Sequence, residues 1–160
     1  MLQNWSAFID PVEFNNLTDF VNQVKNGNIL VNKFCVINGD SCTGKTTLLN
    51  DIINEIGQNE CVNFHFLTTN QEFENNKLEK KLIFFNQTFD QTNDNECQSS
   101  AMIKEIISRQ KYFSRKILYD SKTEPFIPTA NIIIISSSLN TIDDGLLKRA
   151  IIINLTHKFN

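Results

Sequence analysis

The sequence predicts an α/β fold in which a mostly parallel sheet lies between two layers of helices, a three-layer α/β/α arrangement. Short continuous apolar runs, most clearly at 33–38 and 131–136, are typical of strands that are buried on both faces. Between such runs lie segments with apolar residues at helical spacing, for example 45–56. Strands that alternate with helices favour parallel pairing through helical crossovers.

Helices are predicted where apolar residues recur every three or four positions, and Gly27 and Gly57 are plausible stops. Strands are predicted where apolar residues form short runs or alternate with polar ones. In chain order, the expected elements are a helix at 12–26, a strand at 33–38, a helix at 45–56, a strand at 61–67, a polar connection or short helix at 69–80, a strand at 81–88, a helix at 99–110, a hairpin or loop at 112–128, a strand at 131–136 and a short helix running into a strand at 145–155. Residues 1–32 are expected to be a helical lead-in and residues 33–160 the core domain.

Composition narrows the class of protein. With 160 residues, 41% of them apolar and 21% charged, the chain is long enough for one globular domain with a core. A net charge of −3 requires that any nucleic-acid contact come from a local basic patch. The four cysteines are scattered without a CxxC pair, which argues against zinc and for reduced thiols. No apolar run is long enough for a membrane span, so we expect an intracellular protein, in the cytoplasm or in a host cell if the chain is viral.

One motif carries specific chemistry. Residues 39–46 read GDSCTGKT and match G-x-x-x-x-G-K-[ST] between a predicted strand and a predicted helix. Glycines at both ends allow successive backbone N–H groups to converge on phosphate oxygens. Lys45 would reach the β- and γ-phosphates, and the hydroxyl of Thr46 would coordinate Mg²⁺. The sequence therefore predicts a loop that binds ATP with Mg²⁺. Its binding positions are Gly39, Asp40, Ser41, Cys42, Thr43, Gly44, Lys45, Thr46 and Thr47.

The C-terminal half contains an ordered series of shorter motifs. They are Ile103-Lys104, Arg115, Leu118-Tyr119, Phe126-Ile127-Pro128, the apolar run 132–135, Asp144 and Arg149. Together with the phosphate-binding loop, this order over residues 33–155 resembles the ATPase domain of the superfamily 3 helicases, within the AAA+ ATPases. The resemblance is closest to poxvirus-type and phage-type primase-helicases. Each piece alone is weak, and the order is what makes the resemblance specific.

The resemblance implies a P-loop NTPase fold of the AAA+ type and a homo-oligomeric ring, a hexamer, that couples ATP hydrolysis to movement along single-stranded DNA. It implies catalytic roles for Lys45 in the loop, for Gln87 at the position of the acidic strand, for Ser138 as the sensor of the γ-phosphate and for Arg149. The arginine would reach the γ-phosphate held by a neighbouring subunit.

The chain departs from this family at three places. The family's Gly-Gly-Asp-like turn is replaced by residues 108–110, and the sensor, usually asparagine, falls on Ser138. The strand that should end in a carboxylate ends in Asn86 and Gln87. An amide can orient a water molecule but cannot accept its proton. Asp120 is no substitute, because too few residues separate it from the next strand for a parallel crossover.

Basic and aromatic residues alternate over 111–122, a mixture that suits the backbone and bases of single-stranded DNA. The expected DNA contacts are Lys111, Arg115, Lys116 and Lys122. The alternative interpretation is a solvated hairpin face whose aromatic rings turn into the core.

Two functional hypotheses follow. The first is the ATP-binding core of a viral or plasmid-type superfamily 3 DNA helicase in replication, either a stand-alone ATPase or part of a larger protein. The second is a nucleotide-binding paralogue that does not hydrolyse ATP and has a scaffold or regulatory role. A small-molecule kinase is disfavoured because Arg149 lies near the C-terminus without a lid-like insertion.

Overall fold

The computed structural model describes residues 2–66, 68–87, 94–117 and 122–159, with the backbone alone for residues 87 and 94–98. Among these residues, no helix is both long and apolar enough to cross a bilayer. The helices of four or more residues are η1 (Leu2–Ala7), α1 (Pro11–Lys25), α2 (Lys45–Ile56), α3 (Gln71–Glu74), η3 (Asn75–Glu79), α4 (Asp94–Ser108) and α5 (Asp144–Leu147). Two single turns of 3₁₀-helix are η2 (Gln58–Glu60) and η4 (Leu139–Thr141).

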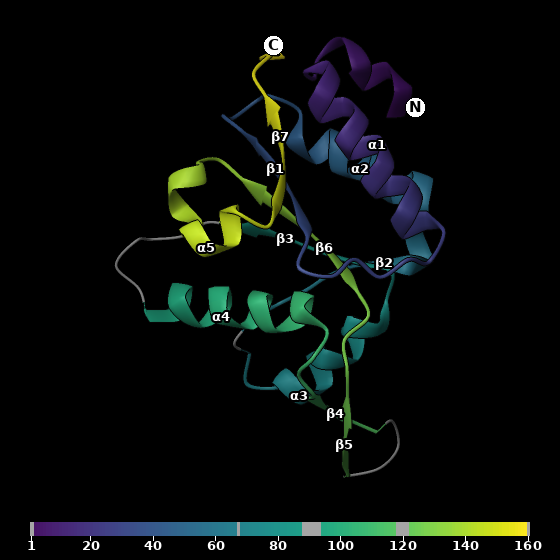
Figure 1. Ribbon diagram of the computed structural model, residues 1–160, viewed down its shortest axis with the longest axis vertical. Helices are drawn as coiled ribbons and strands as arrows, with labels where there is room; N and C mark the ends of the chain where they lie inside the picture. Colours follow the sequence, from purple (N-terminus) through teal and green to yellow (C-terminus); the bar gives the residue numbers. More distant parts are fainter. Residues whose placement is uncertain (1, 67, 88–93, 118–121, 160) are drawn as a thin grey trace.

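The strands form one large sheet and one hairpin. They are β1 (Phe34–Gly39), β2 (Cys61–Asn63), β3 (Leu82–Gln87), β4 (Phe113–Lys116), β5 (Thr123–Phe126), β6 (Asn131–Ser136) and β7 (Ala150–Leu155). The large sheet has the order β2-β3-β6-β1-β7, and every neighbouring pair in it is parallel. The predicted three-layer α/β/α arrangement is confirmed, because α1 and α2 cover one face of this sheet while α4 and α5 lie on the other (Figure 1).

The N-terminal helices belong to the same core as the sheet. Leu17, Phe20 and Val24 of α1 are fully buried and share a hydrophobic cluster with Ile37 of β1 and Ile52 of α2. Asp10 caps α1 by accepting hydrogen bonds from the N–H groups of residues 12 and 13. Glu13 of α1 also binds the free edge of β7, where its carboxylate accepts a 2.9 Å hydrogen bond from the N–H of Asn154.

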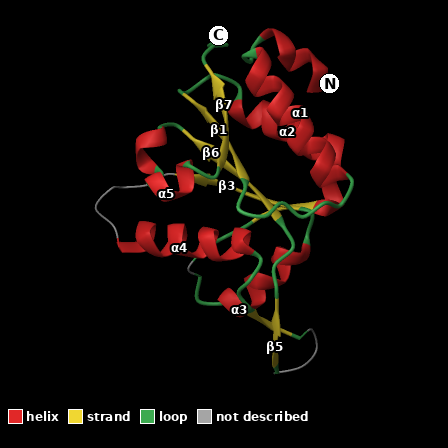
Figure 2. Ribbon diagram, in the orientation of Figure 1, coloured by secondary structure: helices red, strands yellow, loops and turns green. Residues whose placement is uncertain are grey.

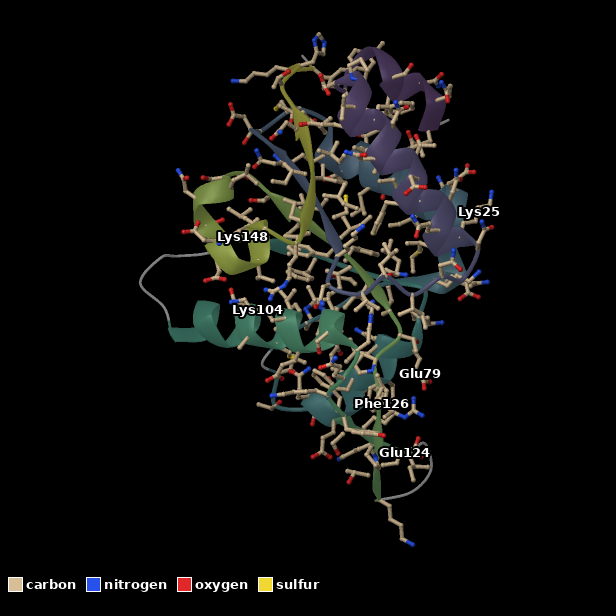
Figure 3. All side chains as sticks on the ribbon, viewed as in Figure 1. Lys25, Glu79, Lys104, Glu124, Phe126 and Lys148 are labelled. Carbon is tan, nitrogen blue, oxygen red and sulfur yellow. The ribbon has the colours of Figure 1, made fainter. Side chains whose placement is uncertain are left out.

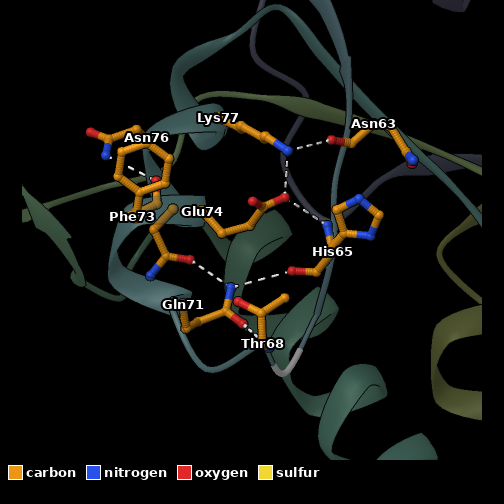
Figure 4. Close-up of polar contacts among 9 residues, drawn as sticks. Asn63, His65, Thr68, Gln71, Phe73, Glu74, Asn76 and Lys77 are labelled. Atoms are coloured by element: carbon orange, nitrogen blue, oxygen red, sulfur yellow. Dashed lines mark hydrogen bonds and ion pairs between the residues drawn. The ribbon is translucent and has the colours of Figure 1, made fainter.

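The strand predicted at 61–67 ends early, at Asn63, because polar side chains of α3 and η3 take up the next backbone groups. The N–H of His65 donates to Glu74 at 3.0 Å, and Lys77 donates to the carbonyl of Asn63 at 3.1 Å (Figure 4). Glu74 and Lys77 themselves form a 2.6 Å ion pair. The polar connection after β2 is thus helical and is tied to the end of the strand.

The segment between β3 and β6 contains a helix and a hairpin, as expected. Helix α4 begins five residues before the predicted start and ends at Ser108, and the next residue, Arg109, has a left-handed backbone with φ 57°. Strands β4 and β5 pair antiparallel, with Phe113 opposite Phe126, and the hairpin lies at the end of the molecule away from both termini (Figures 1 and 2). The prediction of a hairpin at 112–128 is confirmed, whereas Asp120 lies outside the described residues.

A buried polar network joins the start of β6 to two loops. Asn131, only 2% exposed, accepts a 3.0 Å hydrogen bond from the N–H of Leu30 and donates a 2.9 Å bond to the carbonyl of Asn28. The guanidinium of Arg109 lies in the same network and donates to the carbonyls of Leu30 and Pro128. Burial lowers the pKa of Arg109 to about 10, so the group is still charged at neutral pH.

Replacement of this asparagine tests the network. Asn131→Ala removes both an acceptor and a donor and takes this partner from the N–H of Leu30 and the carbonyl of Asn28, so we expect the free energy of unfolding to fall by about 1–3 kcal/mol. Urea denaturation measures this change. In the exposed control Asn59→Ala the free energy of unfolding should change by less than about 0.5 kcal/mol. Equal values for the two variants would show that the network does not stabilise the fold.

Candidate nucleotide site

The predicted phosphate-binding loop lies between β1 and α2 with the expected backbone geometry. Gly44, the residue before α2, is left-handed with φ 86°, a conformation that costs glycine little. At Gly39 a Cβ atom would stand 2.6 Å from the carbonyl oxygen of Leu155 and 2.6 Å from the hydroxyl of Thr43, so only glycine fits. The two glycines of the motif are therefore required by the geometry of the loop itself.

Lys45 begins α2 and folds back over the loop. Its ammonium donates hydrogen bonds to the carbonyl oxygens of Gly39 and Asp40, the latter at 2.7 Å. The buried hydroxyl of Thr43 donates to the same Asp40 oxygen, also at 2.7 Å. The lysine charge thus lies at the amino end of a twelve-residue helix, where the helix dipole adds positive potential. This arrangement suits phosphate oxygens.

The two threonines that follow Lys45 occupy the first turn of α2 with exposed side chains. The hydroxyl of Thr46 is available to a cation next to the loop, as the sequence predicted. Asp40, Ser41 and Cys42 are exposed on the loop, and Cys42 has a left-handed backbone with φ 65°. Among the described residues there is no group of three or more His, Cys, Asp or Glu that could hold a metal ion.

The sheet order brings β3 and β6 to the same edge as the loop. Strand β6 lies between β1 and β3, and its last residue, Ser136, pairs with Asn38 on one side and Gln87 on the other. The carboxyl ends of all three strands therefore meet at one edge, where ligands of open α/β sheets bind. The end of β3 lies two strand spacings from β1, about 10 Å.

Asn86 lies on the face of the sheet that carries α2. The alternation of β3 shows this, because Leu82 and Phe84 pack in the α1–α2 cluster while Ile83 and Phe85 pack in the α4 cluster. Asn86 continues the first set and is exposed. The backbone of Gln87 follows it at the end of β3, and its side chain lies outside the described residues.

The predicted sensor, Ser138, lies two residues beyond the end of β6. Its hydroxyl accepts a 3.3 Å hydrogen bond from the N–H of Asn140 and caps η4. Ser136 is buried and donates to the carbonyl of Ser138 at 2.9 Å. Ser137, between them, is exposed and continues the alternation of Ile133 and Ile135, which pack on the α2 side. The sequence analysis did not single out Ser137, although the period-two alternation of β6 predicts that it lies on the α2 side of the sheet.

Arg149 lies at the amino ends of the parallel strands, whereas the loop lies at their carboxyl ends. The arginine directly precedes β7, whose first residue pairs with Phe34 at the start of β1. The six residues of β1, about 17 Å of extended chain, separate this level from Gly39, which is more than an arginine side chain can span. Arg149 is exposed, and its guanidinium donates to the carbonyl of Gly145 at 3.0 Å. It does not reach the phosphate-binding loop of its own chain.

Of the four predicted DNA contacts, Arg115 is engaged within the chain. Its guanidinium pairs with Glu79 and with Glu124, at 2.8 Å for the latter, and lies 4.6 Å from the ring centre of Phe126. Figure 3 shows these three partners at the hairpin end of the molecule. The hydrogen bond to Glu79 is the main cause that raises the pKa of Arg115. Its side chain is only 18% exposed. Arg115 therefore holds the hairpin to η3, and we do not assign it to DNA.

The other basic residues of this region lie at the surface. Lys111 is exposed and forms a 2.9 Å ion pair with Glu105. Lys116 and Lys122 are exposed on the hairpin strands or next to them. Tyr112 is 70% exposed and follows Lys111 directly, whereas Phe113 packs against the core. The structure thus places three lysines and one exposed aromatic ring around the hairpin, and Tyr119 lies outside the described residues.

Comparison with known proteins finds no family model and no curated sequence that matches. Solved structures do match. JCV helicase bound to a substituted acetamide is 11% identical with a TM-score of 0.62, over 89% of this chain and 41% of that one. A second JCV helicase structure is 14% identical with a TM-score of 0.54, over 91% and 40%. NtrX from Brucella abortus in complex with ADP is 12% identical with a TM-score of 0.50, over 93% and 37%.

The chain spans about two fifths of the length of each of these proteins. At such low identity the matches show the fold alone. The chain has the three-layer α/β/α fold of the P-loop NTPases, which it shares with the JCV helicase and NtrX structures.

Proposed function

We propose that this chain binds ATP and Mg²⁺ on the loop at 39–47 and forms the ATPase core of a superfamily 3 type DNA helicase. The observation that carries the proposal is the position of the Lys45 ammonium, over the loop and at the amino end of α2. In the proposed site Lys45 binds the β- and γ-phosphates and Thr46 binds the metal. The JCV helicase structures support the motor interpretation because they share the fold.

In the proposed motor several subunits form a ring, with a hexamer as the expected state. Arg149 acts on the nucleotide of a neighbouring subunit, in agreement with its exposure and its distance from its own loop. Ser138 or Ser137 senses the γ-phosphate from the end of β6. The exposed lysines 111, 116 and 122 bind the backbone of single-stranded DNA, with Tyr112 as a stacking surface. Such a ring would work inside a cell.

A second candidate function is favoured by the end of β3. Asn86 and Gln87 are neutral amides at the edge where a P-loop ATPase normally has a carboxylate that activates water. In this alternative, the chain binds ATP without hydrolysing it and acts as a scaffold or regulatory subunit. Binding and turnover, measured separately, distinguish the two functions.

Nucleotide binding is tested at the loop lysine. Lys45→Ala removes charge-assisted hydrogen bonds to phosphate, so we expect about 10- to 100-fold weaker binding of a non-hydrolysable ATP analogue with Mg²⁺. Isothermal titration calorimetry measures the affinity. Lys33→Ala serves as the matched control, because Lys33 is exposed at the opposite end of β1. Equal affinities for the two variants would refute nucleotide binding at this loop.

Turnover is tested at the end of β3. Gln87→Glu supplies a carboxylate that can accept a proton from the attacking water, and general-base catalysis of this kind contributes about 10²-fold or more. We therefore expect phosphate release to rise by at least about 10-fold. The double variant Lys45→Ala, Gln87→Glu should show none of this gain. If the rate of Gln87→Glu equals that of the wild type, the end of β3 is not the water-activating position.

The role of Arg149 is tested by mixing subunits. Arg149→Ala should lower turnover by about 10³-fold, as should Lys45→Ala. A mixture of the two variants should recover part of the activity, because the arginine of one subunit then faces the intact loop of another. Lys148→Ala, which changes the exposed neighbouring residue, is the control and should retain full turnover. A mixture as inactive as its components would exclude an arginine supplied between subunits. If the wild type does not turn over, the Gln87→Glu background is used throughout.

A further inference from the structure

A cavity of about 490 Å³ adjoins the phosphate-binding loop on the side away from β3 and β6. Three aromatic rings line it, from Trp5 and Phe8 near the start of the chain and Phe159 near its end. Gly44 and Thr47, on the loop and in the first turn of α2, line the same cavity. This volume is typical of pockets that hold a small molecule.

The aromatic wall is attached directly to the loop. The N–H of Phe159 donates a 2.7 Å hydrogen bond to the carbonyl of Cys42. A Cβ atom at Gly44 would stand 3.0 Å from the Trp5 ring and 3.2 Å from the Phe159 ring. The rings also contact one another edge to face, with centroids 5.3 Å apart for Phe8 and Phe159 and 6.3 Å for Trp5 and Phe159. Loop and rings therefore form one continuous surface.

The cavity has polar groups as well as rings. The indole N–H of Trp5 donates to the carboxylate of Asp51 at 2.8 Å, which holds the ring against α2. Asp51 itself and the amide of Asn4 line the cavity and are able to hydrogen-bond the edge of a ligand. Planar apolar faces with a few fixed polar groups are what a heteroaromatic ring requires.

We propose that this cavity binds the base of the nucleotide whose phosphates are held by the loop. Phosphates at Lys45 and Thr46 direct the rest of the nucleotide past Thr47, which is part of the cavity wall. The base then stacks against Phe159 and Phe8, and its edge faces Asn4 and Asp51. The inference rests on the proposed function, because it requires that the loop bind a nucleotide.

The experiment compares ATP with inorganic tripolyphosphate, which has the phosphates and no base. Both are titrated with Mg²⁺ into the wild-type chain and followed by calorimetry and by the fluorescence of Trp5, the only tryptophan. We expect ATP to bind at least about 10-fold more tightly, because stacking of a base on aromatic rings contributes strongly to affinity. ATP, and not tripolyphosphate, should change the Trp5 emission.

Two variants test the rings. Phe159→Ala and Phe8→Ala, which replace rings 40% and 37% exposed, should each weaken ATP binding by about 5- to 30-fold and change tripolyphosphate binding by less than about 2-fold. Phe73→Ala, at an exposed phenylalanine on α3, is the matched control and should change neither affinity. Because Phe8 and Phe159 lie on different segments, each variant checks the result of the other.

Three results would overturn the inference. The first is equal affinity of the wild type for the two ligands. The second is equal weakening of both ligands by the ring variants, which would mean that the rings only shape the loop. The third is binding of neither ligand, which overturns the proposed function as well. The first two results leave phosphate binding at the loop in place, so the two failures are distinguishable.

Discussion

The candidate site depends on close packing at the end of β1. The carbonyl oxygen of Leu155 in β7 and the hydroxyl of Thr43 in the loop occupy the space that a side chain at position 39 would need. Thr43 binds the carbonyl of Asp40, and Lys45 binds the same carbonyl together with that of Gly39. The position of the lysine charge thus follows from strand pairing through a chain of short contacts. A shift of β7 relative to β1 would therefore alter the conformation of the loop.

The periodicity of the apolar residues and the motif at 39–46 were enough to predict most of the fold. The helix at 45–56 and the strand at 131–136 have the predicted bounds, because their apolar residues leave no competing structure. The strand at 61–67 was overextended, since its pattern does not reveal that Glu74 takes the N–H of His65. The early start of α4 was missed because residues 94–98 are polar and carry no helical period.

Features of the site that lie within a short stretch of sequence were predictable, whereas contacts between residues distant in the chain were not. The loop was predictable because its motif lies in eight consecutive residues. The engagement of Arg115 by Glu79 was not, because the partner lies on a separate element, and the aromatic cavity was not, because Trp5 and Phe159 meet only in the folded chain. The amides at the end of β3 were visible in the sequence. The sheet order adds that β3 ends at the same edge of the sheet as the loop. The fold itself does not distinguish a motor from a scaffold, since one fold supports many activities.

The position of β1 between β6 and β7 has a consequence for how the molecule folds. Both of its neighbours are distant in the chain, and Asn38 bonds Asn154 across 116 positions. Pairings of such high contact order close large loops and form late in folding. During synthesis the segment 34–56 emerges long before the strand that fixes its geometry. The geometry of the loop is therefore complete only after β7 has been synthesised and has paired with β1, and a nucleotide that binds the loop would stabilise the folded molecule without assisting the earlier stages of folding.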